Sequence, residues 1–284
     1  MKLLLRRIRN LYVNIFVFIL VTGFKIVNFL LFGRIITSLT LDKIWSQTLK
    51  IRVRNKFYFF HTPSLLTYFR AKTMLTKEPE TITWIDRFSA GSVFWDVGAN
   101  VGTFTIYAGK KNLEVIAIEP SYLNLELLTR NVISNNLSQL VTIIPLGVGR
   151  STSLENLYLS NKQLTWGGAH NSMGSNIGFD GDPLQDPISL KSLSFTIDDL
   201  VEILGINAPT HLKIDIDGLE AEVLQGSTKS LKYIKSILIE VDSDYLKQKE
   251  EIIRILLNNN FKLSEETEPH SGTSNQIWDN VIFL

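Results

Sequence analysis

A strand, a glycine-bearing turn and a helix start follow one another in residues 93–105, VFWDVGANVGTFT, and this segment constrains the fold more than any other. Its apolar run ends at Asp96, and Gly98 and Gly102 then lead into a helical pattern. The next apolar run along the chain ends at Glu119. A glycine turn before a helix N-terminus suits a nucleotide-like ligand, and Glu119 is an acceptor placed to hold two ribose hydroxyls.

The spacing of the glycines distinguishes two classes of nucleotide ligand. A dinucleotide site favours G-x-G-x-x-G, in which close glycines let the backbone touch a pyrophosphate. Here Gly98 and Gly102 are separated by three residues, and Asp96 precedes them. A carboxylate at that position repels a pyrophosphate but accepts a hydrogen bond from an ammonium group. The pattern therefore favours a nucleoside that carries an amino acid, S-adenosylmethionine.

Composition excludes several functional classes. The chain of 284 residues contains no cysteine, which rules out a disulfide framework, thiolate metal sites and cysteine nucleophiles. Residues 1–41 carry six basic residues and no acidic one, so the rest of the chain has a net charge of −5. This mildly acidic body argues against a nucleic-acid partner, because binding phosphates requires a basic face.

The N-terminal segment, residues 11–36, consists mainly of Leu, Ile, Val and Phe. The longest stretch without a charge, Asn10 to Phe24, is 15 residues, which is short for a membrane span. A helical projection gives a narrow polar stripe that favours a helix in the interface of an anionic membrane over a true span or packing against protein. The stripe consists of Arg7, Asn10, Asn14, Thr22, Lys25 and Asn28.

We therefore expect residues 1–36 to contact a membrane surface. The first alanine of the chain is Ala71, so no A-x-A cleavage site follows the apolar run. A cytoplasmic location is expected, with this helix as the candidate attachment to the cytoplasmic face of a membrane.

Three segments are predicted along the chain: an N-terminal helix over residues 1–40, a leading extension or lid over 41–90, and the main domain over 91–284. Within the extension, residues 51–60 alternate as a strand pair. Helical stretches around 64–75 and 80–89 lead into the first strand of the main domain.

From residue 91 onward the pattern alternates between strands and helices, which predicts an α/β fold with a doubly wound, mostly parallel sheet and helices on both faces. The predicted strands are 93–97, 114–119, 140–145, 211–216, 235–241, 259–264 and 277–283, and the predicted helices are 102–110, 121–135, 196–203, 218–225 and 243–258. Ligands bind outside the carboxyl ends of such strands. Four carboxylates fall at or near these ends and should converge on one rim: Asp96, Glu119, Asp215 and Glu240.

Residues 160–190 break this rhythm, because they are rich in Gly, Ser, Asn, Asp and Pro. A connection of this length beside a binding rim is usually functional, which favours a role in substrate recognition. A disordered surface insertion is the alternative.

Several segments together resemble the FkbM family of S-adenosylmethionine-dependent methyltransferases. They are FWDVGANVGTFTIYAG (94–109), VIAIEPS (115–121), RNVISNN (130–136), SFTIDDL (194–200), HLKIDIDGLEAEVLQG (211–226), IKSILIEVD (234–242) and WDNVIFL (278–284). The resemblance implies a Rossmann-like class I methyltransferase fold with a seven-stranded sheet. It also implies methyl transfer, typically to oxygen in sugars or secondary metabolites. Asp217 stands where the family commonly has Glu, and the first 50 residues are not covered.

The same resemblance implies the residues that hold S-adenosylmethionine. Asp96 and the turn from Gly98 to Gly102 face the methionine part, Glu119 takes the ribose hydroxyls, and Pro120 and Ser121 shape the adenine side. The candidate cofactor residues are Asp96, Gly98, Asn100, Gly102, Thr105, Glu119, Pro120 and Ser121.

Methyl transfer to a hydroxyl needs a positioned acceptor and a group that removes its proton. The candidate bases are Asp215, which is the first choice by its position, Glu240 and His211. Asp217 and Glu220 are expected mainly to cap the following helix and to compensate its dipole. No spacing of His residues predicts a metal site.

Three classes of function remain open from the sequence. The first is an O-methyltransferase acting on a small-molecule or glycan acceptor. The second is a nicotinamide-dependent oxidoreductase, which Asp96 and the missing close glycine pair disfavour. The third is a non-catalytic, membrane-associated binding protein on the same fold, for which loss of Asp96, Gly98 or Glu119 would be expected.

Overall fold

The computed structural model describes residues 2–30, 34–161, 164–169, 171–176, 178, 182–269 and 272–284. These residues form two compact units, Met1–Gln47 and Thr48–Leu284.

The N-terminal unit consists of two helices, α1 (Lys2–Leu30) and α2 (Arg34–Trp45). The apolar side chains of residues 11–21 are exposed, with Phe16 63% and Phe18 70% accessible. Of the predicted polar stripe, the side chains of Arg7, Asn10 and Asn28 lie outside the described part. Among the helices that the structure describes, none combines the length and apolar character needed to cross a bilayer.

The larger unit is built on a seven-stranded sheet in the order β12-β13-β11-β10-β3-β4-β5. The strands are β3 (Val93–Val97), β4 (Glu114–Ile118), β5 (Val141–Ile144), β10 (His211–Ile214), β11 (Ser236–Asp242), β12 (Phe261–Glu266) and β13 (Thr273–Asn280). Neighbours from β5 to β11 are parallel, whereas β13 runs antiparallel to both β11 and β12. This order confirms the predicted mostly parallel, doubly wound sheet.

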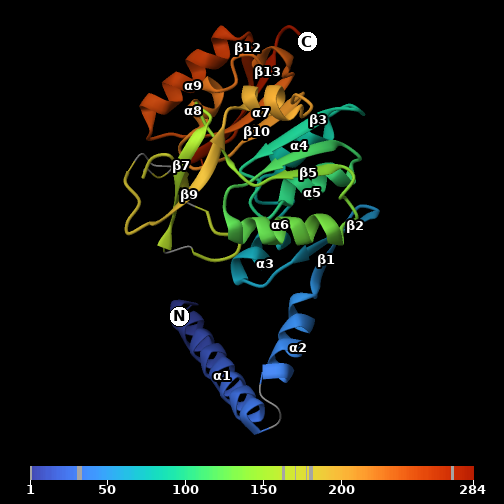
Figure 1. Ribbon diagram of the computed structural model, residues 1–284, viewed down its shortest axis with the longest axis vertical. Helices are drawn as coiled ribbons and strands as arrows, with labels where there is room; N and C mark the ends of the chain where they lie inside the picture. Colours follow the sequence, from blue (N-terminus) through green and yellow to red (C-terminus); the bar gives the residue numbers. More distant parts are fainter. Residues whose placement is uncertain are drawn as a thin grey trace. The chain divides into compact units, whose positions relative to one another are not determined.

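Helices cover both faces of this sheet because buried strand residues alternate between two apolar cores. Trp95 and Val97 point into the core shared with α7 (Ile197–Leu204), α8 (Glu220–Gln225) and α9 (Leu246–Asn258). Phe94 points into the core on the other face, shared with α4 (Pro79–Asp86), α5 (Thr103–Lys110) and α6 (Tyr122–Ser134). Figure 1 shows the sheet between these two layers.

The segment that precedes the sheet packs into the same unit. A hairpin of β1 (Thr48–Val53) and β2 (Lys56–His61) turns at Arg54 and Asn55, and α3 (Leu65–Lys72) follows. The buried side chains of the hairpin belong to the core under α5 and α6.

A second, four-stranded sheet in the order β6-β9-β7-β8 was not predicted. It comprises β6 (Gly147–Val148), β7 (Ser153–Leu159), β8 (Ser172–Met173) and β9 (Ile188–Phe195). Its long strands carry apolar residues on the exposed face as well: Leu154 is 62% and Leu193 52% accessible. The alternation of apolar and polar residues that indicates a strand is therefore weak in β7 and β9. Strand β8 lies within residues 160–190, for which the sequence predicts no strand.

Candidate active site

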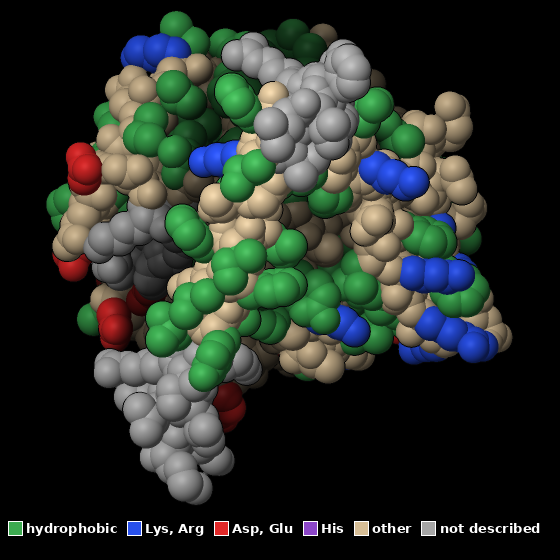
Figure 2. Space-filling view, turned by 90° about the horizontal axis from the view of Figure 1, so that it is seen from below, with side chains coloured by type: hydrophobic (Ala, Val, Ile, Leu, Met, Phe, Trp, Pro, Cys, Tyr) green, Lys and Arg blue, Asp and Glu red, His purple; other side chains and the backbone are tan. Residues whose placement is uncertain are grey.

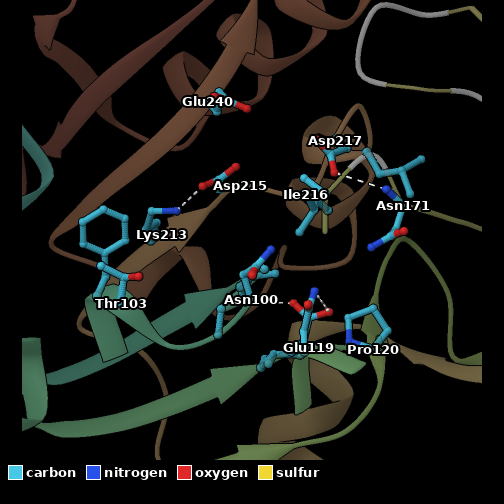
Figure 3. A pocket seen from close by; sticks show the side chains of 18 of the residues that line it. Asn100, Thr103, Glu119, Pro120, Asn171, Lys213, Asp215, Ile216, Asp217 and Glu240 are labelled. Atoms are coloured by element: carbon cyan, nitrogen blue, oxygen red, sulfur yellow. Dashed lines mark hydrogen bonds and ion pairs between the residues drawn. The ribbon is translucent and has the colours of Figure 1, made fainter. Parts of the chain in front are cut away.

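A cavity of about 660 Å³ opens at the carboxyl ends of the parallel strands. Among its lining residues are Gly98, Asn100, Glu119, Asp215, Asp217 and Glu240. Glu119 and Pro120 lie at one end of the view in Figure 3 and Glu240 at the other, with Asp215 and Lys213 between them. Three of the four carboxylates predicted to share a rim, Glu119, Asp215 and Glu240, therefore line one cavity.

The glycine turn brings the ends of β3 and β10 into close contact. Gly98 has φ +82°, and a Cβ atom built on it would lie 1.9 Å from the carbonyl oxygen of Asp215. Its N–H donates to the carbonyl oxygen of Ile118 at 3.0 Å. Only glycine fits this conformation and this approach. The turn thus places its own backbone directly beside Asp215.

Glu119 is a buried carboxylate held by the two turns around it. One oxygen accepts from the N–H of Asn100 at 2.9 Å, and the other from the N–H of Ser121 at 2.9 Å and from Asn124 Nδ2 at 3.4 Å. Burial raises its pKa to about 7, although these hydrogen bonds favour the charged form. The carboxylate keeps acceptor capacity for a ligand, because three bonds do not fill its roughly four lone-pair sites.

The Asn124 side chain links Glu119 to the segment that follows β7. It accepts from the N–H of Gly167 at 3.0 Å and donates to the carbonyl oxygen of Gly168 at 3.1 Å. Asn100 Nδ2 donates to the same Gly168 oxygen at 3.0 Å. Residues 167–168 are thereby fixed beside the Glu119 end of the cavity.

Asp96 lies behind the cavity wall and is 1% accessible. One of its oxygens accepts from Thr105 Oγ1 at 2.6 Å, while Oδ1 has no hydrogen-bond partner among the described residues. Burial raises the pKa of this carboxyl. Gly102, Thr105 and Ser121 likewise support the site from behind, so four of the eight predicted cofactor residues, Gly98, Asn100, Glu119 and Pro120, line the cavity itself.

Asp215 follows β10 and forms an ion pair with Lys213, whose Nζ lies 2.5 Å from Oδ2. Burial on its own would raise the pKa of Asp215, but the Lys213 ammonium more than offsets this and lowers it below the usual range. Lys213 itself is buried, and its Nζ lies 5.1 Å from the centroid of the Phe104 ring. Asp215 is therefore ionised and fixed in direction.

Glu240 has the opposite character. It lies in β11 and accepts from Thr273 Oγ1 at 3.1 Å. Burial, followed by the nearby charges of Asp215 and Glu220, raises its pKa to about 9. At neutral pH this side chain is a neutral acid that can donate a hydrogen bond, and it is a poor candidate for a base.

Glu220 lies in the first turn of α8, as expected for compensation of the helix dipole, but neither Asp217 nor Glu220 caps the helix, because its N-cap residue is Leu219. Glu220 instead accepts from the backbone N–H groups of Ile216 and Gly218 at 3.3 and 3.2 Å and so holds the turn after β10. Asp217 lines the cavity and accepts from the N–H of Asn171 at 3.3 Å.

The structure places His211 away from the cavity, and we do not retain it as a catalytic candidate. It begins β10, at the opposite end of the strand from Asp215. Its ring lies 3.7 Å from the Phe88 ring and its Nδ1 2.8 Å from Ser236 Oγ. Burial lowers its pKa to about 4. These contacts favour a packing role.

Sequence reasoning missed several residues of the site. Lys213 carried a signal, because a lysine inside a buried apolar strand needs a partner. For Asn124 and Phe104 the sequence indicated helices but gave no sign that these side chains line a cavity. Arg70, Lys77 and Glu78, which also line the cavity, come from the leading segment, and only the fold brings them there.

The predicted recognition segment, residues 160–190, does reach the cavity. Gly168, Ala169, Asn171, Ser172 and Met173 line it. Residues 162–163, 170, 177 and 179–181 of the segment lie outside the described part. Among the described residues, no group of three or more His, Cys, Asp or Glu side chains is arranged to hold a metal ion.

The order of the large sheet and a carboxylate-lined cavity at its parallel strand ends define a Rossmann-like class I methyltransferase fold. The model of the methyltransferase FkbM domain matches residues 96–263, more than half of the chain. The chain belongs to the FkbM methyltransferase domain family.

One relative is the hexuronic acid methyltransferase AglP of Haloferax volcanii, which is 30% identical over 149 residues. The match covers 52% of this chain and 55% of the relative, so the chain spans only about half of that protein's length.

Two solved structures are also similar. A methyltransferase FkbM from Methylobacillus flagellatus is 19% identical with a TM-score of 0.47, over 68% of this chain and 44% of that one. A precorrin-6y C5,15-methyltransferase from Geobacter metallireducens is 14% identical with a TM-score of 0.43, over 74% of this chain and 91% of that one.

Proposed function

We propose that this protein is an S-adenosylmethionine-dependent methyltransferase that methylates a hydroxyl oxygen of a sugar, glycan or secondary metabolite. One observation carries the proposal: a single cavity joins a ribose-type carboxylate, Glu119, to an ionised and oriented carboxylate, Asp215. Glu119 suits the methyl donor, S-adenosylmethionine, and Asp215 suits the hydroxyl group that accepts the methyl group. Family membership supports the same reaction class.

The residues at the Glu119 end fit this cofactor. Glu119 has acceptor capacity for ribose hydroxyls, and the turn at Gly98 exposes backbone where a side chain cannot stand. Oδ1 of Asp96, which has no hydrogen-bond partner in the described part of the chain, is a buried acceptor behind this turn, and this supports the predicted link to an ammonium group. When bound, S-adenosylmethionine supplies an activated methyl group on a sulfonium.

The protein's own task is then to place the acceptor and to take its proton. Asp215 accepts the proton of the acceptor hydroxyl, and Lys213 holds the carboxylate in position. Glu240, neutral at pH 7, orients the acceptor by donating a hydrogen bond. General-base assistance of this kind contributes roughly 10²- to 10⁴-fold to a rate.

A sugar acceptor is favoured by the far end of the cavity and by the named relative. Glu80, Thr273 and Asn275 line this end, and Asn275 Nδ2 donates to Glu80 Oε1 at 2.6 Å. Paired carboxylates and amides suit hydroxyl groups, while Lys77 and Arg70 line the same cavity and add positive charge near Asp215. The relative acts on a hexuronic acid, which makes acidic sugars the first acceptors to test.

Calorimetry tests the donor. We expect S-adenosylmethionine and S-adenosylhomocysteine to bind and NAD not to bind. Glu119→Ala and Asp96→Ala should each weaken binding by about tenfold, or about 1.4 kcal/mol. Tight NAD binding without binding of the other two would replace the proposal with the oxidoreductase. If neither variant changed the affinity, the pocket would be misplaced.

A screen of free and lipid-linked glycans, with and without hexuronic acid, tests the acceptor. The expected readout is a mass gain of one methylene that depends on S-adenosylmethionine. Transfer to none of these acceptors, together with firm cofactor binding, would contradict the sugar acceptor and leave the methyl donor intact.

We also propose that the protein is cytoplasmic and that residues 1–36 contact a membrane surface. The exposed apolar side chains of α1 support this part of the proposal.

A further inference from the structure

Positive and negative charges are separated along this chain, and the positive part extends beyond the two N-terminal helices. Residues 1–77 contain 14 of the 29 Lys and Arg residues and one of the 28 acidic residues, Asp42, which gives a net charge of +13. The remaining residues carry a net charge of −12. The basic region therefore continues into the larger unit, where the β1–β2 hairpin carries part of it.

The hairpin separates its side chains by face. Ile51, Val53, Tyr58 and Phe60 point inward and pack in the core. The outer face consists of Lys50 and Arg52 on β1 and Phe57 and Phe59 on β2, where Lys50 pairs with Phe59 and Arg52 with Phe57. Lys50 Nζ lies 3.8 Å from the centroid of the Phe57 ring, and Phe57 is 42% accessible.

Helix α6 holds the backbone of β2. Asn135 Oδ1 accepts from the N–H of Phe59 at 3.1 Å, and Asn135 Nδ2 donates to the carbonyl oxygen of Phe59 at 2.7 Å. Asn131 accepts from the N–H of His61 at 2.8 Å. The strand that carries Phe57 and Phe59 is thus tied to the larger unit.

None of the four outer-face residues lines the cavity, so the proposed methyl transfer does not explain them. Figure 2 shows Lys and Arg side chains gathered with hydrophobic ones on the side where the hairpin lies in Figure 1, and acidic side chains on the opposite side. Exposed cations beside an exposed aromatic ring match the interface of an anionic bilayer. The hairpin also begins three residues after α2, close in sequence to the exposed apolar side chains of α1.

We propose that the outer face of the β1–β2 hairpin binds the headgroups of anionic lipids at a membrane surface. Lys50 and Arg52 contact the negatively charged headgroups, and Phe57 enters the boundary between headgroups and acyl chains. This binding is separate from the catalytic cavity, and it adds a contact from the larger unit to the one expected from residues 1–36.

The test uses the full chain and co-sedimentation with two kinds of vesicle, phosphatidylcholine alone and phosphatidylcholine with phosphatidylglycerol. The wild type should partition more strongly onto the anionic vesicles, and this preference should weaken with salt. The double variant Lys50→Gln/Arg52→Gln should lower the partition coefficient by about thirtyfold, since two basic contacts are lost. The control is Lys232→Gln/Lys235→Gln, because Lys232 also stands over an aromatic ring, that of Tyr233, at 4.8 Å.

The control variant should partition like the wild type, and all three proteins should melt at the same temperature. The proposal is overturned if the wild type shows no preference for anionic vesicles, if Lys50→Gln/Arg52→Gln binds them like the wild type, or if both double variants lose binding equally. Binding of single-stranded RNA in place of vesicles would overturn it as well. Because no step of the assay needs methyl transfer, its result is independent of the proposed enzymatic activity.

Discussion

Two carboxyl groups at neighbouring strand ends are held in opposite protonation states. Lys213 keeps Asp215 ionised, whereas burial and the neighbouring negative charges keep Glu240 protonated. Paired acids whose pKa values are pushed apart commonly divide the roles of acceptor and donor between them. This division, more than position along the strand, supports our proposal that Asp215 is the base.

Asp215→Asn tests that assignment. The amide keeps the shape of the side chain but cannot accept the proton, so turnover should fall by roughly 10²- to 10⁴-fold. Cofactor affinity measured by calorimetry should change little, because Asp215 is not expected to bind the ribose or the amino-acid part. Turnover equal to that of the wild type would remove Asp215 as the base.

Glu240→Gln tests the neutral state of Glu240 through stability. The folded pKa of about 9 lies above the ordinary glutamate value of 4.5, so protonation favours the folded state. This contribution is complete below pH 4.5 and is lost as the pH rises through about 9. The melting temperature of the wild type should therefore fall more steeply between pH 4.5 and about 9 than that of the variant, which has no titratable proton at this position.

Glu119 and Glu220, with pKa values of about 7, shift stability in the same direction in both proteins. The difference between the two melting curves therefore isolates Glu240. Parallel curves for wild type and variant would show that Glu240 is ionised in the folded protein.

At the scale of the elements, the turn after β3 brings its backbone against the residue that follows β10. Gly98→Ala should be strongly destabilising, because the added Cβ would meet the Asp215 carbonyl oxygen at 1.9 Å. Gly91→Ala is a matched control: its φ is +80°, and a Cβ there meets nothing within 4 Å.

We expect the control to cost about 1 kcal/mol of unfolding free energy, from its backbone conformation alone. The Gly98 variant should cost about 2 kcal/mol more and lose cofactor binding, because the contact forces β3 and β10 apart. Chemical denaturation of both variants measures the difference. Equal losses would mean that the turn adapts without strain.

The elements that the sequence predicted well are those whose pattern reflects burial on both faces. Strands such as 93–97 and 114–118 read as short apolar runs between turn residues, and each lies inside the sheet with a neighbouring strand on both sides. The four-stranded sheet escaped prediction because its outward residues, including Leu154 and Leu193, are apolar too. For the site, strand ends indicated Glu119, Asp215 and Glu240. His211 begins its strand, so the rule that ligands bind outside the carboxyl ends of parallel strands already argued against it.

At the scale of the whole molecule, the chain divides after Gln47 into a helical unit and a unit with its own cores. The second unit holds every residue that lines the cavity. Removing residues 1–47 should therefore leave the melting temperature and the cofactor affinity of the remainder unchanged, while vesicle binding falls. Loss of the folded state on truncation would show that the helical unit contributes to the core of the larger one.

The cavity wall draws on three stretches of chain. The family domain, residues 96–263, supplies the carboxylates at the proposed donor end, but Glu80 precedes this domain and Asn275 follows it. These two are joined by a hydrogen bond of 2.6 Å, so the flanking stretches meet each other across the site. Paired substitutions at these two positions, outside the family domain, can then change which acceptor is bound without altering the residues at the donor end of the cavity. The two flanks should accordingly vary together among relatives that share the domain but modify different sugars.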